Sequence, residues 1–227
     1  MTLTPAQEDT WLVIPLFDEA QVVEEVLREA RAYFPHVVCV DDASRDDSAA
    51  RARAAGAVVV RHPFNLGQGA ALQTGMRFVL EATDAAYLVT FDADGQHQPV
   101  DAAAMVQRAR DEDLAIVFGS RFLDDRTRPG WLKKLVLKVA VWLTNQQTGM
   151  RLTDAHNGLR VIRRDAATRL DLRQNRMAHA TEIVLQLGRT RLPWAEHPVH
   201  VLYTDYSRTK GQSLMNSVNI LVDSILK

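Results

Sequence analysis

The stretch at 86–97 decides how the chain is interpreted. It is Ala86-Tyr87-Leu88-Val89-Thr90-Phe91-Asp92-Ala93-Asp94-Gly95-Gln96-His97. Its apolar first half predicts a buried strand over 86–91. Side chains at i and i+2 leave a strand on the same side, so Asp92 and Asp94 are expected to point together. Two such carboxylates repel each other unless a cation joins them, and Mg²⁺ or Mn²⁺ suits hard oxygen ligands. Gln96 and His97 are candidates for a further ligand or for a contact that supports the carboxylates. The alternative is a plain turn in which an Asp caps a helix beginning near Pro99.

Apolar segments alternate with amphipathic ones through the first half of the chain. Strands are predicted over 11–16, 37–40, 57–60, 86–91 and 114–118, and helices over 19–32, 46–55, 69–82 and 101–112. Continuous Val, Leu and Ile strands separated by helices predict an α/β fold with a mostly parallel central sheet and helices on both faces. Ligands of such sheets bind at the carboxyl ends of the strands. Polar clusters at 17–19, 41–44 and 92–97 lie at those ends.

The alternation weakens after Arg121. Further helices are predicted over 131–145, 181–187 and 213–226, and further strands over 158–162 and 199–203. No internal repeat or long linker interrupts the chain. The length of 227 residues therefore predicts one domain.

Composition excludes several classes of protein. The chain is 47% hydrophobic and 24% charged, as in ordinary globular proteins, and its net charge of −1 gives no support to nucleic-acid binding. The lone Cys39 lies in an apolar run, which excludes a disulfide framework and fits a reducing cytosol. The first ten residues do not form a signal peptide, and no uncharged apolar run reaches the ~18 residues of a membrane span. We expect a soluble or peripheral protein.

Two further polar clusters allow alternative interpretations. Asp41, Asp42 and Ser44 either cap a helix or accept hydrogen bonds from a nucleobase or ribose. The glycines of Asn65-Leu66-Gly67-Gln68-Gly69 precede a predicted helix, where backbone N–H groups are able to hold an anion. This stretch lacks the Gly-Lys-Ser/Thr ending of a Walker loop and the spacing of a dinucleotide-binding loop.

Five motifs occur in a fixed order along the chain. They are Pro15-Leu16-Phe17-Asp18-Glu19, Val40-Asp41-Asp42-Ala43-Ser44-Arg45-Asp46, Asn65-Leu66-Gly67-Gln68-Gly69, Asp92-Ala93-Asp94-Gly95-Gln96-His97 and Gly119-Ser120-Arg121. Together they resemble family 2 glycosyltransferases of the Rossmann-like GT-A fold, the fold of nucleotide-diphospho-sugar transferases. The segment Thr153-Asp154-Ala155-His156-Asn157-Gly158-Leu159-Arg160 is similar to that of dolichyl-phosphate mannose and polyprenyl-phosphate glucose synthases.

The resemblance implies one GT-A-like catalytic domain over 1–227. Its nucleotide-sugar-binding half spans about 11–120 and its acceptor-binding half, with amphipathic helices, about 121–227. The donor-binding positions implied by the family motifs are Pro15, Phe17, Glu19, Asp42, Gln68 and Asp92. Asp92 and Asp94, with Gln96 close by, match the metal-diphosphate motif. The chain departs from the family pattern at Asp18, where Asn is common, at Gln68, where Lys is common, and at His156-Asn157, where small residues are usual.

The implied reaction is an inverting transfer of a hexose from a nucleotide-diphosphate sugar. A metal on Asp92 and Asp94 would stabilise the departing diphosphate. A hydroxyl acceptor needs a general base, for which Asp154 is the candidate and Glu182 its rival, although Glu182 also suits a plain helix-dipole partner. A polyprenyl phosphate of undecaprenyl or dolichyl type is already ionised and needs cations instead. The candidate cations are Arg121, Arg160, Arg208 and Lys210. We expect Asp94, Asp154 and Arg160 to be catalytic, and Arg121 and Lys210 to bind substrate.

The segment 131–143 bears on the membrane. It predicts a helix with one apolar face, with Lys134 and Lys138 on another face and Trp near both ends. This pattern suits a helix in a bilayer interface, although a core helix with solvated lysines has the same pattern. We expect a cytoplasmic enzyme attached peripherally to the inner face of the membrane, with a possible separate membrane subunit or self-association.

Three alternatives to this function follow from the same residues. One is a glycosyltransferase of the same fold that acts on a saccharide hydroxyl. Another is a nucleotidyltransferase, which shares the sheet and the carboxylates. Such an enzyme usually has a Gly-rich, Arg-containing loop after the first strand, and Phe17-Asp18-Glu19 is not one. The last is a non-catalytic binding protein, against which the intact Asp92 and Asp94 argue.

Overall fold

A seven-stranded sheet forms the centre of the molecule, in the order β3-β2-β1-β4-β6-β5-β7. The computed structural model describes residues 7–124, 141–142, 144–175 and 178–202. The strands are β1 Thr10–Leu16, β2 His36–Asp41, β3 Val58–Arg61, β4 Tyr87–Thr90, β5 Ile116–Ser120, β6 Arg160–Arg163 and β7 Trp194–Pro198. Strand β6 pairs antiparallel with β4 and β5, and the other pairings are parallel. The predicted mostly parallel sheet is confirmed.

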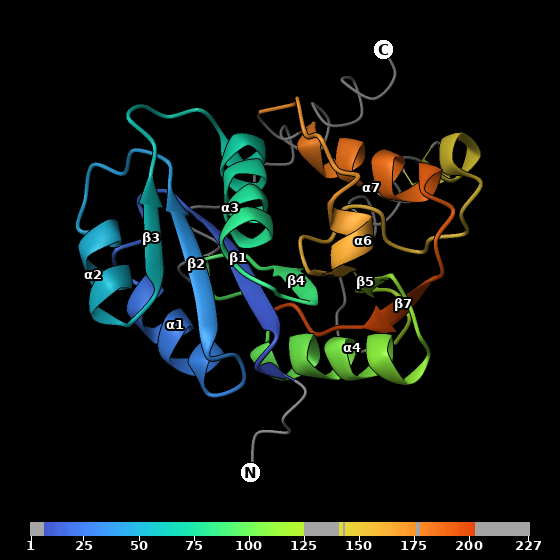
Figure 1. The fold of residues 1–227 in the computed structure, drawn as a ribbon, viewed down its shortest axis with the longest axis horizontal. Coiled ribbons are helices and arrows are strands. Elements are labelled where there is room, and N and C mark those ends of the chain that lie inside the picture. The colour runs from blue at the N-terminus through green and yellow to red at the C-terminus, as the bar shows by residue number, and fades with distance from the viewer. Residues whose placement is uncertain (1–6, 125–140, 143, 176–177, 203–227) are drawn as a thin grey trace.

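Helices cover both faces of this sheet, as predicted (Figure 1). They are α1 Val23–Arg31, α2 Ser48–Ala54, α3 Gln68–Ala82, α4 Pro99–Asp111, α6 Arg164–Ala167 and α7 His179–Arg189, with a helical segment at 144–148. Helices α1, α2 and α4 pack on one face, and α3, α6 and α7 on the other. None of the helices in the described ranges is long and apolar enough to cross a bilayer.

Successive side chains along each strand point to opposite faces of the sheet, so the core has two layers. In β1, Leu12 and Ile14 face the layer beneath α1 and α4, whereas Val13 faces α3. Both faces are covered, so most strand residues are buried and the strands are almost continuously apolar. Cys39 is fully buried as a free thiol, as predicted. Burial and the nearby charge of Asp41 raise the pKa of that thiol to about 12.

The strand predicted over 199–203 is wrong within the described residues. The last strand is β7, Trp194–Pro198, at the edge of the sheet beside β5. Its sequence Trp-Ala-Glu-His-Pro lacks an apolar run because an edge strand is half-exposed and tolerates proline. The segment 199–202 instead crosses to the loop after β4. The Leu202 N donates to the Gln96 carbonyl in that loop at 2.9 Å, and the His200 N donates to Asp101 Oδ2 in the first turn of α4 at 2.6 Å.

Other element predictions differ in their bounds or lie outside the described residues. Helix α1 begins at Val23 instead of Glu19, because the Glu19 carbonyl accepts from the N–H groups of Val22 and Val23 in a preceding turn. The helix predicted over 213–226 lies outside the described residues, as does 131–140 of the helix predicted over 131–145.

Helix α3 lies very close to the sheet at Gly75. A Cβ atom at this position would lie closer than 3.0 Å to Val13 Cγ1 and 3.1 Å from Val40 Cγ2. Both neighbours are β-branched residues within strands and have little rotamer freedom. Glycine is therefore needed here for close packing, which places the first turn of α3 against the ends of the strands.

We expect Gly75→Ala to lower the free energy of unfolding by about 1–3 kcal/mol, as overpacked core positions do. Helix propensity alone predicts the opposite, a gain of about 1 kcal/mol. Urea denaturation followed by circular dichroism measures the difference. A variant at least as stable as the wild type would show that α3 is free to move away from the sheet.

Candidate functional site

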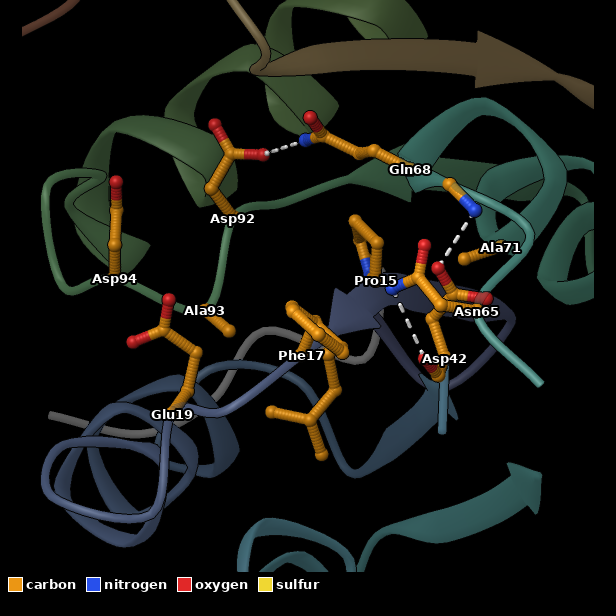
Figure 2. A pocket seen from close by; sticks show the side chains of 12 residues that line it. Pro15, Phe17, Glu19, Asp42, Asn65, Gln68, Ala71, Asp92, Ala93 and Asp94 are labelled. Carbon is orange, nitrogen blue, oxygen red and sulfur yellow. Dashed lines mark hydrogen bonds between the residues drawn. The ribbon is translucent and has the colours of Figure 1, made fainter. Parts of the chain in front are cut away.

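A cavity of about 470 Å³ lies where the carboxyl ends of β1, β2 and β4 meet the start of α3. Its lining residues are Pro15, Leu16, Phe17, Glu19, Asp42, Asn65, Gly67, Gln68, Ala71, Asp92, Ala93 and Asp94 (Figure 2). Seven positions that the sequence motifs singled out, namely Pro15, Phe17, Glu19, Asp42, Gln68, Asp92 and Asp94, thus lie around one space. The volume lies within the range of small-molecule sites.

Asp92 and Asp94 form the acidic end of this cavity, with Glu19 beside Asp94 (Figure 2). The Asp92 carboxylate is held from both sides. Its Oδ2 lies 2.9 Å from His97 Nε2, and its Oδ1 accepts from Gln68 Nε2 at 3.1 Å. Asp94 Oδ1 accepts from the Gln96 N at 3.0 Å, in a turn where Gly95 has a φ of 75°. The carboxylates are thus presented by a fixed turn and do not cap α4, whose N-cap is Gln98.

The two carboxylates differ electrostatically. Burial raises the pKa of Asp94 to about 6, and the nearby charge of Asp92 adds to the shift. Burial also disfavours charge on Asp92, but the hydrogen bond and charge of His97, together with the Arg160 and His179 charges, lower its pKa overall. A divalent cation between them would offset the repulsion that opposes ionisation of Asp94.

These carboxylates are suited to a metal that shares its coordination with a substrate. Within the described residues, no group of three or more His, Cys, Asp or Glu side chains is arranged to hold an ion. Mg²⁺ and its like are commonly bound by one or two carboxylates plus substrate phosphates. Asp92 and Asp94 fit that description. Gln96 does not line the cavity, and its backbone N–H and carbonyl groups bond Asp94 and Leu202. That the Gln96 side chain is a metal ligand stays a prediction.

Asp42 forms the opposite end of the cavity, and its carboxylate binds the chain itself. Oδ1 lies 2.7 Å from His62 Nδ1 and accepts from the Leu66 N at 2.8 Å, while Oδ2 accepts from the Gly67 N at 2.7 Å. The Asp42 carbonyl accepts from Asn65 Nδ2 at 3.2 Å. Asp42 therefore fixes the 65–67 loop.

This arrangement corrects two of the alternatives raised by the sequence. The 41–44 cluster does not cap a helix, because α2 begins at Ser48 with Asp47 as its N-cap. In the 65–69 stretch, where an anion cradle was one alternative, three backbone N–H groups are engaged by the chain itself. The N–H groups of Leu66 and Gly67 donate to Asp42, and that of Gly69 donates to the Asn175 carbonyl at 2.9 Å.

The loops after β1 and β2 are bonded to each other beneath the cavity. Asp18 and Ala43 have φ values of 53° and 62°, a region that costs free energy for residues other than glycine. The Asp18 N donates to Ser44 Oγ at 3.0 Å, and Asp18 Oδ1 accepts from the Arg45 N at 2.7 Å. The Glu19 N donates to Ser48 Oγ at 2.7 Å. These bonds hold Phe17 and Glu19 at the cavity.

Asp154, the predicted base or acceptor-orienting carboxylate, forms a buried ion pair with Arg121. Its Oδ2 accepts from Arg121 Nε at 2.6 Å and its Oδ1 from Nη2 at 2.8 Å. The backbone N–H groups of Arg121 and His156 donate to the same carboxylate. Burial opposes ionisation, but the charge and hydrogen bonds of Arg121 lower the pKa of Asp154. A carboxylate so engaged is suited to orienting Arg121 more than to taking a proton.

The rival carboxylate, Glu182, holds a loop. It accepts from the backbone N–H groups of Arg173 and Gln174, the latter at 2.8 Å, and does not line the cavity. Its position in the first turn of α7 also fits a helix-dipole partner.

Arg160 lies at the start of β6, paired with Thr90 of β4, and is 2% exposed. Among the described residues, its Nε and Nη2 have no hydrogen-bond partner. Burial lowers the pKa of Arg160 to about 10, an effect that the charges of Asp92 and Asp154 oppose. Arg160, Arg121 and Asp154 do not line the cavity. Arg208 and Lys210 lie outside the described residues.

Two residues that hold the site were not identified from the sequence. His62 supports Asp42, and Glu196 of β7 accepts from the N–H groups of Thr153 and Asp154 at 2.8 and 3.0 Å. Both act across strands distant in the sequence and leave no local pattern. His97, by contrast, supports Asp92, which is one of the roles that the 92–97 motif predicted for it.

The fold and the cavity define a class: an α/β protein whose acidic motif follows β4 at the carboxyl end of a Rossmann-like sheet. Residues 11–170 match the family model for glycosyl transferase family 2. The chain belongs to glycosyltransferase family 2, and its fold is GT-A.

Relatives and solved structures agree with this assignment. The chain is 30% identical to an uncharacterized protein of Methanocaldococcus jannaschii, over 97% of this chain and 93% of that one. It is 27% identical to the UDP-N-acetylglucosamine–dolichyl-phosphate N-acetylglucosaminyltransferase of Methanococcus voltae, over 90% of each chain. Its fold matches that of glucosyl-3-phosphoglycerate synthase from Mycobacterium tuberculosis in complex with Mn²⁺, UDP-glucose and phosphoglyceric acid. The TM-score is 0.72 at 19% identity, covering 100% of this chain and 83% of that one.

We expect Asp94→Asn to abolish the rise in Tm that Mn²⁺ with a nucleoside diphosphate gives the wild type, because one carboxylate of the pair is lost. In the absence of metal, the variant should melt higher than the wild type, because the repulsion by Asp92 is relieved. Differential scanning fluorimetry measures both effects. Asp84→Asn, at an exposed carboxylate before β4 and so at the opposite end of the sheet, is the matched control. An unchanged metal response in Asp94→Asn would exclude this pair as the metal site.

Proposed function

We propose that the protein is a metal-dependent, inverting glycosyltransferase that moves a hexose from a nucleotide-diphosphate sugar to a polyprenyl phosphate. The observation that carries the acceptor assignment is the buried Asp154–Arg121 ion pair. It engages the carboxylate that a hydroxyl acceptor would need as a base. An acceptor that is already ionised needs no such base and is bound by cations.

The cavity suits an elongated donor. The acidic end would hold Mg²⁺ or Mn²⁺ through Asp92 and Asp94, together with the diphosphate, and the Pro15, Phe17 and Asp42 end would hold the nucleoside. When bound, the metal supplies positive charge that stabilises the departing nucleoside diphosphate. The synthase structure of matching fold contains Mn²⁺ with UDP-glucose, which supports a divalent metal and a nucleotide sugar as ligands by analogy.

The reaction is a single displacement. A phosphate oxygen of the acceptor forms a bond to the anomeric carbon while the bond from that carbon to the diphosphate oxygen breaks. The electron pair goes to the departing nucleoside diphosphate, and the configuration inverts. Arg121, oriented by Asp154, and the buried Arg160 are the cations proposed for the acceptor side. Lys210 is proposed from its sequence position alone.

Relatives support a lipid acceptor in this family. The Methanococcus voltae relative is named for transfer to dolichyl phosphate. The glucosyl-3-phosphoglycerate synthase keeps a hydroxyl-bearing acceptor open as the alternative. The family match argues against the nucleotidyltransferase alternative.

The remaining features of the proposal concern location and organisation. We place the enzyme in the cytoplasm, attached peripherally to the inner face of the membrane where a polyprenyl phosphate resides. We treat 1–227 as one catalytic domain whose donor half is about 11–120 and whose acceptor half is about 121–227. A separate membrane subunit or a homo-oligomer stays a prediction.

A donor screen tests this function. The protein is incubated with Mn²⁺ or Mg²⁺, anionic liposomes that contain polyprenyl phosphate, and each common UDP-, GDP- or dTDP-sugar. We expect glycolipid and nucleoside diphosphate from one donor, detected by mass spectrometry, and co-flotation of the protein with the liposomes. Hydrolysis of a donor without glycolipid would move the acceptor to a hydroxyl. Failure to float would remove peripheral attachment from the proposal.

The substitution Asp154→Asn tests whether Asp154 orients Arg121 or acts as a general base. We expect kcat to fall by roughly tenfold or less, whereas loss of a general base typically costs on the order of 10²–10⁴-fold. The matched control is Asp165→Asn, which removes a carboxylate from an exposed pair with Arg163. Initial rates are measured at saturating donor and acceptor, and thermal melts verify that each variant is folded. A fall beyond 10²-fold in a folded variant would identify Asp154 as a base and favour the hydroxyl acceptor.

A further inference from the structure

His62 is a buried residue that follows β3, the edge strand at the far end of the sheet from β7. Its side chain is 7% exposed, and both ring nitrogens lie in short hydrogen bonds. Nδ1 is 2.7 Å from Asp42 Oδ1, and Nε2 is 2.9 Å from Thr74 Oγ1 on α3. Because a carboxylate only accepts, the proton lies on Nδ1, and the Thr74 hydroxyl either donates to Nε2 or accepts from it. One side chain thus joins β2, β3 and α3.

The partner of His62, Asp42, controls the shape of one end of the donor cavity. The carboxylate accepts from the N–H groups of Leu66 and Gly67, and the Asp42 carbonyl accepts from Asn65. Gly67 has a φ of 100°, so this loop adopts a backbone conformation that a residue with a Cβ rarely takes. Its shape therefore depends on the bonds to Asp42.

The loop leads directly into the cavity and into α3. Asn65 and Gly67 line the cavity, and the next residue, Gln68, donates to Asp92 (Figure 2). If the Asp42 carboxylate rotated, the loop would lose the two hydrogen bonds that the N–H groups of Leu66 and Gly67 donate to it. His62 is the side chain that holds this carboxylate in the required orientation, while Thr74 fixes the plane of the imidazole.

We propose that His62 is a positioning residue for the nucleoside end of the donor: it orients Asp42, which holds the 65–67 loop in the shape that receives the nucleotide. This inference rests on the proposed function only in taking the cavity as the site of a nucleoside diphosphate. It does not depend on the identity of the acceptor.

Two substitutions distinguish the two bonds of the imidazole. His62→Asn keeps an N–H group at the position of Nδ1 and loses the bond to Thr74. His62→Gln keeps a group at the position of Nε2 and loses the bond to Asp42. Binding of UDP, GDP and dTDP is measured by titration calorimetry with Mn²⁺, first to the full-length wild type and then, for the nucleotide that binds, to each variant.

We expect the Kd of His62→Gln to rise by roughly tenfold or more, as for the loss of a hydrogen bond to a charged group. The Kd of His62→Asn should stay within about threefold of the wild type, although its Tm falls. A purely structural role would lower Tm in both variants without this split in Kd. His36→Gln, at the opposite end of β2, is the matched control and should leave Kd unchanged.

Each result decides the inference. Equal losses of affinity in the two His62 variants, or no loss in either, would overturn it. If His62→Gln melts below the assay temperature, the test uses Thr74→Val and His62→Asn, which both remove the bond to Thr74 and keep the bond to Asp42. A rise in Kd of about tenfold in either variant would refute the role given to the Asp42 bond. If no nucleotide binds the wild type, the donor cavity itself is refuted. Nucleotide binding without glycolipid formation would refute only the proposal that the acceptor is a polyprenyl phosphate.

Discussion

Two carboxylates, Asp92 and Asp94, are held within one turn at the carboxyl end of β4, and their mutual repulsion is the constraint around which the site is built. The cost of this arrangement is evident in Asp94. Burial and the charge of Asp92 together raise the pKa of this carboxyl group to about 6. The turn persists because neighbouring segments fix it. His97 and Gln68 hold Asp92, and Leu202 bonds the carbonyl of Gln96. Such strained or repulsive arrangements are maintained where surrounding structure over-determines them, and they cluster at functional sites.

The segment around Gly158 is packed directly against this turn. A Cβ atom on Gly158 would lie closer than 3.0 Å to Asp92 Oδ2, and the Gly158 carbonyl accepts from Thr90 Oγ1 at 2.6 Å. Only glycine leaves room for the Asp92 carboxylate here. The insertion of β6 between β4 and β5 therefore brings the segment that begins at Thr153 to the Asp92 carboxylate.

Much of the cavity could be predicted from the sequence, because its lining residues follow strands in short motifs and parallel strands end at the same edge. Phe17, Asp42 and Asp92 meet for this reason. What could not be predicted depends on contacts between distant strands. His62 reaches Asp42 across the β3–β2 edge, and Glu196 reaches the 153–154 backbone from β7. Strand β7 itself was missed because its half-exposed edge position allows Glu, His and Pro.

The charges of two distant segments meet at Arg160. This buried guanidinium interacts electrostatically with both Asp92 and Asp154, and two of its nitrogens lack partners among the described residues. A buried cation without a hydrogen-bonded counter-charge is costly, and burial accordingly lowers its pKa to about 10. Phosphate groups on either side of it would supply the missing negative charge. Under the function proposed above, Arg160 would stabilise the phosphates of the donor and the acceptor together, and binding of one substrate would change the affinity for the other.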